Sequence, residues 1–224
     1  MIEIRANKVF SAVKQRGPSR VAHVRIPLRF DPEQEDHSPT LFETYLLIAL
    51  MKLTDATGVF EFGTFMGVTT LNLALNARAG AEIYTLDVDD ASAREVQSEL
   101  PKDGQLIGLR MKHYQMAWSE DFDLARRAPI EALYGDSTRF DFSPYSGRMD
   151  LVFLDGGRDL RTVRSDYGNA AGMLRPYKPA AIAWHDYQNP ETPELTDFLD
   201  QLAGKVDLLH VHGSSLVLYL NFPL

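Results

Sequence analysis

The sequence predicts an α/β fold, with a doubly wound, seven-stranded, mostly parallel sheet that closes in a C-terminal antiparallel hairpin. Two observations lead to this fold class. From residue 38 onward, short apolar runs typical of strands alternate with segments of helical periodicity, as in parallel sheets with right-handed crossovers. Near the C-terminus, two β-rich runs meet at His212-Gly213-Ser214, a link too short for a parallel crossover.

The elements follow in a regular order. Ser38-Pro39-Thr40 is expected to cap a first helix that runs to about Leu53. Five strands joined by helices are then expected at 58–62, 82–87, 130–135, 150–155 and 180–185, and the hairpin strands at 206–211 and 215–220. The helices are expected near 67–78, 91–100, 160–174 and 192–203. The least periodic segment, 101–129, is interpreted as an inserted loop with a short helix, and residues 1–37 as an N-terminal arm before a single domain at 38–224.

Composition narrows the function classes. The 224 residues carry a net charge of −8, which argues against a nucleic-acid partner because such partners normally need a basic face. The chain has no cysteine, shows no signal-peptide pattern, and its longest apolar stretch, Tyr45–Met51, is far shorter than a membrane span. We therefore expect a soluble, cytoplasmic protein without a membrane partner.

Charge is nevertheless uneven along the chain. Residues 1–30 hold seven Arg or Lys against one acid, and Asp31–Asp36 then supplies four acids. Two interpretations remain open: a solvated arm and its boundary, or a contact to an anionic substrate or partner. The arm is also a plausible contact in a homodimer.

The segment 59–67, Val-Phe-Glu-Phe-Gly-Thr-Phe-Met-Gly, is the most informative motif. Gly63 and Gly67 allow a tight turn from strand to helix and a close approach of the backbone to a ligand. The acid Glu61, before the first glycine, disfavours a bound pyrophosphate and suits a ligand with positive charge. This combination indicates a cofactor with a sulfonium and an amino acid group, and it argues against a dinucleotide.

Acidic residues also follow the next two strands. Asp87 lies 24 residues beyond Gly63, where its carboxylate can accept both hydroxyls of a ribose; alternatively, it starts the next turn and helix. Gly135-Asp136-Ser137 ends the following strand, where Asp136 and Ser137 can read an adenine amino edge; alternatively, they cap a turn or helix.

Two further strands deliver Asp155 and Asp186 to the expected site. If these strands are neighbours, the two acids converge, as acids do to hold a hard divalent cation such as Mg²⁺, which can orient a substrate hydroxyl and lower its pKa. The alternative is that Asp155 positions the cofactor and Asp186 caps a loop, with no metal. His185 is the best candidate for a general base by position and ordinary pKa range, although a structural role is an open alternative.

Five motifs in this order resemble those of class I S-adenosylmethionine-dependent methyltransferases, in the bacterial branch related to catechol-type and natural-product or sugar O-methyltransferases. The resemblance covers about residues 38–190, and the C-terminal hairpin also fits. The motifs are Glu61-Phe62-Gly63-Thr64-Phe65-Met66-Gly67, Thr85-Leu86-Asp87, Tyr134-Gly135-Asp136-Ser137, Leu154-Asp155-Gly156-Gly157 and Trp184-His185-Asp186-Tyr187.

The resemblance implies a methyltransferase domain at 38–224 that binds S-adenosyl-L-methionine and methylates a hydroxyl of a small molecule. It implies that Glu61, Gly63 and Thr69 surround the methionine moiety, that Asp87 takes the ribose, and that Asp136 and Ser137 lie beside adenine. The remaining positions implied in the cofactor site are Thr64, Phe65, Gly67, Val88, Gly135 and Asp155. His185, Asp155 and Asp186 are implied as catalytic, and Asp155 and Asp186 as metal ligands.

Two departures from the family pattern bear on the chemistry. Cation-dependent members place Asn or Asp where this chain has Tyr187, and relatives place a Lys or His base where this chain has Arg158, whose guanidinium stays protonated. Two rival functions follow: a member that binds the cofactor without catalysis, and an NAD-dependent oxidoreductase, which the missing Gly-x-Gly-x-x-Gly disfavours. Aromatic residues that can line an acceptor pocket are Tyr114, Trp118 and Trp184, and histidines with weaker claims to catalysis are His113, His210 and His212.

Overall fold

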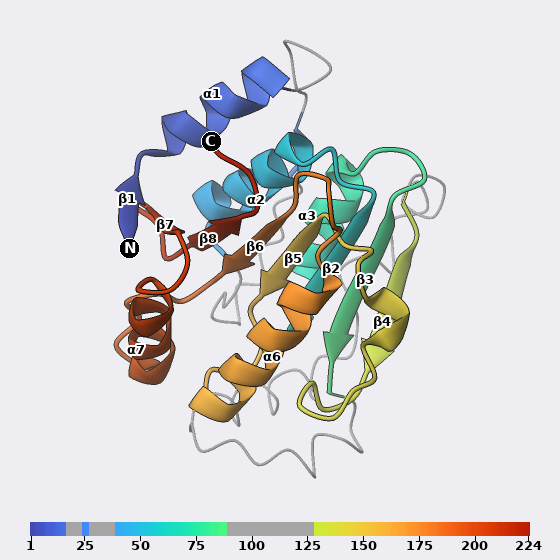
Figure 1. Ribbon diagram of the computed structural model, residues 1–224. Coiled ribbons are helices and arrows are strands. Elements are labelled where there is room, and N and C mark those ends of the chain that lie inside the picture. The colour runs from blue at the N-terminus through green and yellow to red at the C-terminus, as the bar shows by residue number, and fades with distance from the viewer. Residues whose placement is uncertain (17–23, 27–38, 89–127) are drawn as a thin grey trace, which may run out of the picture.

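The computed structural model describes residues 1–16, 24–26, 39–88 and 128–224. In these residues one sheet is covered by helices on both faces (Figure 1). The predicted helix at 91–100 lies outside the described residues, as does nearly all of the segment 101–129, including His113, Tyr114 and Trp118.

The described sheet has eight strands in the order β1-β7-β8-β6-β5-β2-β3-β4. Only β8 among them runs antiparallel to its neighbours, β6 and β7, which confirms the mostly parallel sheet with a C-terminal hairpin. The strands are β1 (Ile2–Ile4), β2 (Gly58–Phe62), β3 (Glu82–Asp87), β4 (Ile130–Tyr134), β5 (Leu151–Leu154), β6 (Ala181–Trp184), β7 (Leu208–Val211) and β8 (Val217–Leu220).

The predicted number of seven strands is one too low, because β1 adds a strand from the predicted N-terminal arm. It pairs in parallel with β7, with Ile2 opposite Leu209 and Ile4 opposite Val211, and the amide of His212 donates to the carbonyl of Ile4 at 2.9 Å. Three residues are too few for alternation to stand out in a basic segment. The domain boundary at residue 37 stays a prediction.

Strand residues alternate between two hydrophobic cores. On one face, β2 contributes Val59 to a core with α1 (Ala6–Arg16), α2 (Leu41–Leu53) and α3 (Val68–Asn76). On the other, β2 contributes Phe60 and Phe62 to a core with α6 (Leu160–Met173), α7 (Pro193–Leu202) and the 3-10 helix Ser143–Tyr145. Since both faces are covered, β5 is a continuous apolar run, buried at all four positions.

A capping box begins α2. The hydroxyl of Thr40 accepts a hydrogen bond from the amide of Glu43 at 3.3 Å, and Oε2 of Glu43 accepts from the amide of Thr40 at 2.9 Å. Thr40 is therefore the N-cap within the predicted Ser38–Thr40 signal. The cap also fixes the position of the Glu43 carboxylate, which is 3% exposed.

Asp150 ties together the amino-terminal ends of β2 and β5, at the opposite edge of the sheet from the glycine turn. Its side chain is fully buried and accepts hydrogen bonds from the amides of Thr57 and Gly58 at 2.7 and 3.2 Å. Arg175 Nε donates to it at 2.9 Å, and Lys178 Nζ lies 3.3 Å away. Because these partners satisfy its buried carboxylate, Asp150 links the ends of the two strands, and its loss should be destabilising.

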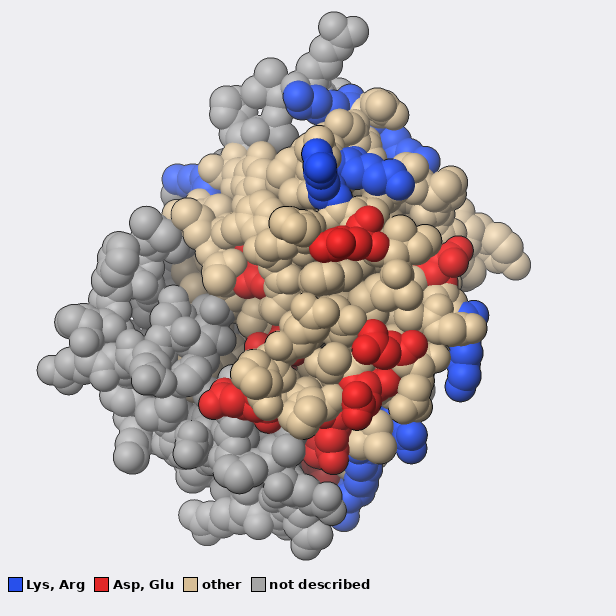
Figure 2. All heavy atoms as spheres, turned by 90° about the vertical axis from the view of Figure 1, so that its left-hand side faces the viewer, with Lys and Arg blue, Asp and Glu red and all other residues tan. Residues whose placement is uncertain are grey.

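Figure 2 shows the face that lies on the β1 side, where basic side chains gather at the top and others lie along the lower right edge beside acidic ones. The upper region is where α1 lies, and this helix carries Lys8, Lys14 and Arg16. The acidic run Asp31–Asp36 lies outside the described residues, so the predicted charge asymmetry stays a prediction. Within the described ranges, every helix is too short or too polar to span a bilayer.

Candidate active site

The carboxyl ends of five parallel strands meet at one edge of the sheet. Their register places Phe62 opposite Leu86 and Leu154, Asp87 opposite Tyr134, and Leu154 opposite Trp184. The segments that follow these residues therefore share one edge: Gly63–Gly67, Val88, Gly135–Ser137, Asp155–Arg158 and His185–Tyr187. As the sequence predicts, the polar motifs converge where ligands bind in open α/β sheets.

Gly63 and Gly67 shape the turn between β2 and α3. Both have left-handed backbones, with φ of 86° and 74°, which glycine adopts without strain. A Cβ on Gly63 would lie 2.3 Å from the carbonyl oxygen of Asp155, so only glycine lets β2 and β5 approach this closely. Gly67 is the N-cap of α3 and accepts a hydrogen bond from the amide of Leu71 at 2.9 Å. The predicted tight turn is confirmed.

Glu61 lies inside the protein, 1% exposed, beside the turn. Its Oε2 accepts hydrogen bonds from the hydroxyls of Thr70 and Thr85, the latter at 2.7 Å. Burial raises the pKa of Glu61 to about 8, although these two hydrogen bonds oppose the rise. Thr64 continues the network, because its hydroxyl lies 2.7 Å from that of Thr85. A direct contact of Glu61 with a methionine moiety stays a prediction.

Asp87 connects the end of β3 to the glycine turn. Its Oδ2 accepts a hydrogen bond from the amide of Phe65, and its Oδ1 accepts one from the amide of Val88, both at 2.7 Å. The side chain is only partly buried. The carboxylate therefore holds two predicted cofactor-site residues in place and stays at the edge where a ribose would bind. Thr69, in the first turn of α3, is 8% exposed.

The segment after β4 forms a turn of its own. Gly135 has φ of 153°, and Oδ1 of Asp136 accepts hydrogen bonds from the amide and the hydroxyl of Thr138 at 2.8 and 2.7 Å. Asp136 thus caps a turn in this structure, which is the alternative that the sequence left open. Ser137 hydrogen-bonds the carboxyl of Asp166, which is 3% exposed and whose pKa burial raises to about 7. An adenine contact by Asp136 or Ser137 stays a prediction.

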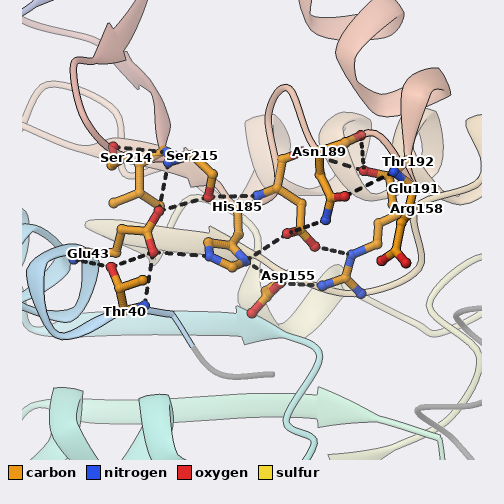
Figure 3. A network of polar contacts seen from close by, with 12 residues as sticks. Thr40, Glu43, Asp155, Arg158, His185, Asn189, Glu191, Thr192, Ser214 and Ser215 are labelled. Carbon is orange, nitrogen blue, oxygen red and sulfur yellow. Dashed lines mark hydrogen bonds and ion pairs between the residues drawn. The ribbon is translucent and has the colours of Figure 1, made fainter. Parts of the chain in front are cut away.

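Asp155 and Asp186 converge, as expected from neighbouring strands, but the guanidinium of Arg158 binds both carboxylates. Figure 3 shows Arg158 beside Asp155. Arg158 Nη2 donates to Oδ1 of Asp155 at 2.7 Å, and Arg158 Nε donates to Oδ2 of Asp186 at 2.6 Å. Arg158 Nη1 donates to the carbonyl of Gly156 at 2.9 Å. All three side chains are about nine-tenths buried, with exposures of 9%, 11% and 12%. The cluster is a two-carboxylate clamp around one arginine.

His185 lies between Asp155 and Glu43, a residue from α2 that the sequence prediction did not include (Figure 3). Nδ1 of His185 is 3.2 Å from Oδ1 of Asp155, and Nε2 is 3.4 Å from Oε2 of Glu43. Burial alone lowers the pKa of His185, but the carboxylates of Asp155, Glu43 and Asp186 outweigh it and raise the pKa to about 10. His185 is therefore an imidazolium at neutral pH.

Ser215 fixes the far side of Glu43. Its amide and hydroxyl donate to Oε1 of Glu43 at 2.7 and 2.8 Å, while Thr40 and His185 use Oε2. Although burial raises the pKa of Glu43, the hydrogen bonds from His185, Ser215 and Thr40 outweigh it and hold the pKa well below its ordinary value. The capping box marks Glu43 as a helix-start residue. Nothing local in the sequence indicates its contact with a strand 142 residues away.

The donor atoms of this cluster determine whether it can bind Mg²⁺. Among the described residues, Asp155, His185 and Asp186 offer ligand atoms within 4.8 Å of one another. However, Arg158 binds both carboxylates, and Tyr187 turns away to donate its hydroxyl to Asp200 at 2.8 Å. The donor set is therefore occupied by the protein's own cation, and it does not fit Mg²⁺ as arranged.

The other singled-out side chains lie elsewhere. Trp184 is 1% exposed and packs against Tyr167, with ring centroids 5.8 Å apart, so it is a core residue. His210 contacts the ring of Tyr187 and lies 2.9 Å from the carbonyl of Ser214 through Nε2. Neither residue has a described hydrogen bond to the acid cluster, the group formed by Glu43, Asp155, Arg158, His185 and Asp186.

Comparison with known proteins identifies a family for the part of the chain that carries these motifs. A family model described as a methyltransferase domain matches residues 60–187, which is more than half of the chain and spans all five motifs. No curated protein matches the sequence significantly.

Solved structures share the fold at low sequence identity. An S-adenosylhomocysteine-bound methyltransferase from Podospora anserina superposes with a TM-score of 0.55 at 17% identity, covering 97% of this chain and 95% of its own. An O-methyltransferase from Bacillus cereus in complex with S-adenosylhomocysteine gives 0.53 at 14%, covering 96% and 89%. The O-methyltransferase TomG from Streptomyces achromogenes, involved in tomaymycin synthesis and solved with S-adenosylmethionine, gives 0.52 at 16%, covering 95% and 86%.

Proposed function

The chain belongs to the methyltransferase domain family, and from this premise we propose that it transfers a methyl group from S-adenosylmethionine to a hydroxyl oxygen of a small molecule. The observation that carries the proposal is what lies at the carboxyl edge of the parallel sheet. The glycine turn, Asp87 and the acid cluster lie side by side at the ends of parallel strands. Two solved structures with the same fold are O-methyltransferases, which supports hydroxyl oxygen as the acceptor atom.

The described residues fit this cofactor on chemical grounds. Gly63 and Gly67 leave room where a side chain would block a ligand, and the partly exposed carboxylate of Asp87 can accept two ribose hydroxyls. We assign the methionine end to the turn and to Thr69, and adenine to the Gly135–Ser137 segment. S-adenosylmethionine supplies an electrophilic methyl group on a sulfonium sulfur, which becomes a neutral thioether after the transfer.

The acid cluster is assigned to the acceptor. In the transfer, the acceptor oxygen bonds to the methyl carbon, the carbon–sulfur bond breaks with its electron pair left on sulfur, and the hydroxyl proton must leave. His185 is already protonated, so it serves as general base only after it loses a carboxylate partner. We assign the proton to Asp155, because this residue follows β5 and its backbone lies against the Gly63 turn, to which we assign the methionine end of the cofactor. Alignment of the reactants contributes about 7–11 kcal/mol in such reactions.

The location and assembly of the protein remain proposals. We propose a cytoplasmic homodimer without a nucleic-acid partner. The net charge of −8 supports the absence of a nucleic-acid partner, and the basic residues on α1 offer a contact for the dimer.

Thermal-shift titration tests the cofactor assignment. We expect S-adenosylhomocysteine to raise the melting temperature and NAD to leave it unchanged. Asp87→Asn should weaken S-adenosylhomocysteine binding by at least about tenfold, which corresponds to about 1.4 kcal/mol. Asp55→Asn is the matched control, because Asp55 pairs with Arg78 on the surface before β2. Equal binding by the two variants would refute the ribose assignment.

Turnover separates an enzyme from a member that only binds the cofactor. The protein is incubated with S-adenosylmethionine and a panel of hydroxylated acceptors, and S-adenosylhomocysteine is quantified. Production that depends on the acceptor supports the proposed function. Cofactor binding without turnover on any acceptor class favours a non-catalytic role.

A further inference from the structure

We propose that the guanidinium of Arg158 takes the place of a divalent cation between Asp155 and Asp186, so that this chain holds its acceptor site together without a metal ion. The inference rests on the proposed function, because it concerns how the same site is built. Of the two interpretations that the sequence left open for Asp155 and Asp186, it favours the one without a metal ion.

The geometry of Arg158 is the first support. Its three nitrogens point to three different acceptors: Nε to Asp186 at 2.6 Å, Nη2 to Asp155 at 2.7 Å and Nη1 to the carbonyl of Gly156 at 2.9 Å. The planar guanidinium thus reads the two carboxylates and the backbone as a fixed set. A cation bound by the same two carboxylates would have to displace a buried arginine that is already paired.

The remaining positions around the cluster are the second support. The Asp186 carboxylate also accepts a hydrogen bond from Asn189 Nδ2 at 3.0 Å, so Asn189 presents its amide hydrogens there and not its oxygen. The Asn189 oxygen accepts the amide of Glu191 at 3.0 Å. Tyr187 donates to Asp200, away from the cluster. The oxygen acceptors described around Arg158 are the two carboxylates and the carbonyl of Gly156, and neither Tyr187 nor Asn189 directs an oxygen there as a further hard ligand.

Charge is the third support. Asp155 and Asp186 contribute two negative charges, and Arg158 neutralises one of them within hydrogen-bond distance. The side chain of His185, at 3.2 Å from Asp155 and 3.6 Å from Asp186, lies against both carboxylates. A divalent ion placed between the acids would meet the guanidinium at close range in a site shielded from water, where repulsion is strong.

Arg158 is therefore a positioning residue in this account. Its hydrogen bonds to Asp155, Asp186 and the carbonyl of Gly156 fix the orientation of Asp155, to which we assign the acceptor proton. It replaces the structural role of a metal ion. It cannot take a proton because it is already protonated, and its low acidity keeps it from giving one.

The test measures metal binding directly, with Mn²⁺ as the probe and the loss of the free Mn²⁺ electron paramagnetic resonance signal as the readout. The full-length protein is compared with Asp186→Asn, Arg158→Ser and the double variant Arg158→Ser/Asp186→Asn. We expect the unmodified protein and Asp186→Asn to bind Mn²⁺ equally, because neither holds a metal ion between residues 155 and 186. Arg158→Ser should bind Mn²⁺ at least about tenfold more tightly than the unmodified protein, and the double variant should lose this gain.

Two outcomes would overturn the proposal. One is Mn²⁺ binding by the unmodified protein that Asp186→Asn abolishes. The other is a folded Arg158→Ser, verified by circular dichroism, that gains no Mn²⁺ site. If Arg158→Ser does not fold, the comparison of the unmodified protein with Asp186→Asn still decides. If the unmodified protein does not bind S-adenosylhomocysteine, this result counts against the proposed function. The Mn²⁺ comparison is read independently of it.

Discussion

The contact between the glycine turn and the end of β5 can be tested by replacing Gly63 with alanine. Two costs add. The left-handed φ of 86° costs alanine about 1–2 kcal/mol. The new Cβ would also lie 2.3 Å from the carbonyl oxygen and 2.7 Å from the carbonyl carbon of Asp155, so the backbones of the two strand ends must separate. Overpacking of this kind costs about 1–3 kcal/mol. We expect Gly63→Ala to lose about 2–5 kcal/mol of unfolding free energy.

Gly80→Ala is the matched control. Gly80 has a similar φ of 78°, but no described atom lies within 4 Å of a Cβ placed there, so this substitution incurs the backbone cost alone. Urea unfolding of both variants, followed by circular dichroism, gives the two free energies, and their difference isolates the close approach. Gly63→Ala should also weaken S-adenosylhomocysteine binding, whereas Gly80→Ala should not. Equal losses of stability would refute the claim that the turn requires glycine for its contact with Asp155.

The remaining predictions concern buried carboxyl groups and pH. The pKa of Glu61 is raised to about 8, so the folded state binds its proton more tightly than the unfolded state, and this contribution to stability is lost as pH rises from about 4.5 through 8. Glu61→Gln should therefore gain stability over the unmodified protein across that interval, by at most about 1.4 kcal/mol per pH unit in urea unfolding, and a parallel pH dependence would exclude the shift. Burial raises the pKa of Asp150, but the hydrogen bonds from Thr57 and Gly58 and the charge of Lys178 outweigh it, so the pKa is lowered and its contribution is lost as pH falls below about 3.8. Asp150→Asn should cost about 3–5 kcal/mol at pH 7 and much less at acid pH, and a cost of equal size at both pH values would contradict this assignment.

The fold was accessible from the sequence because the strands from Gly58 to Leu220 carry strong local signals. β5, for example, is an uninterrupted apolar run followed by Asp155-Gly156-Gly157, and the hairpin is set by the short link at Gly213. β1 was missed because three residues carry too little periodicity, and its place beside β7 depends on pairing across more than 200 residues. Short strands with distant partners are set by tertiary structure.

The sequence predicts where the backbone of the site lies, but it does not predict which side chains pair with one another. The positions of Gly63, Asp87 and Asp155 follow from strand ends, which a sequence pattern can locate. The partners of these groups come from other elements. Glu43 reaches His185 because α2 packs beside the hairpin residue Ser215. Arg158, which follows β5, donates to Asp186, which follows the neighbouring strand β6. The sequence also indicated His185 as a base, whereas Asp155, Asp186 and the partner that it did not predict, Glu43, favour the protonated form.

A crystal structure of the protein with S-adenosylhomocysteine tests the central claim most directly. The account predicts the ribose on the Asp87 carboxylate, the amino acid end against the Gly63–Gly67 turn, and Arg158 still bound to both Asp155 and Asp186. A nucleoside bound away from this edge of the sheet, or a metal ion between the two aspartates with Arg158 displaced, would contradict it.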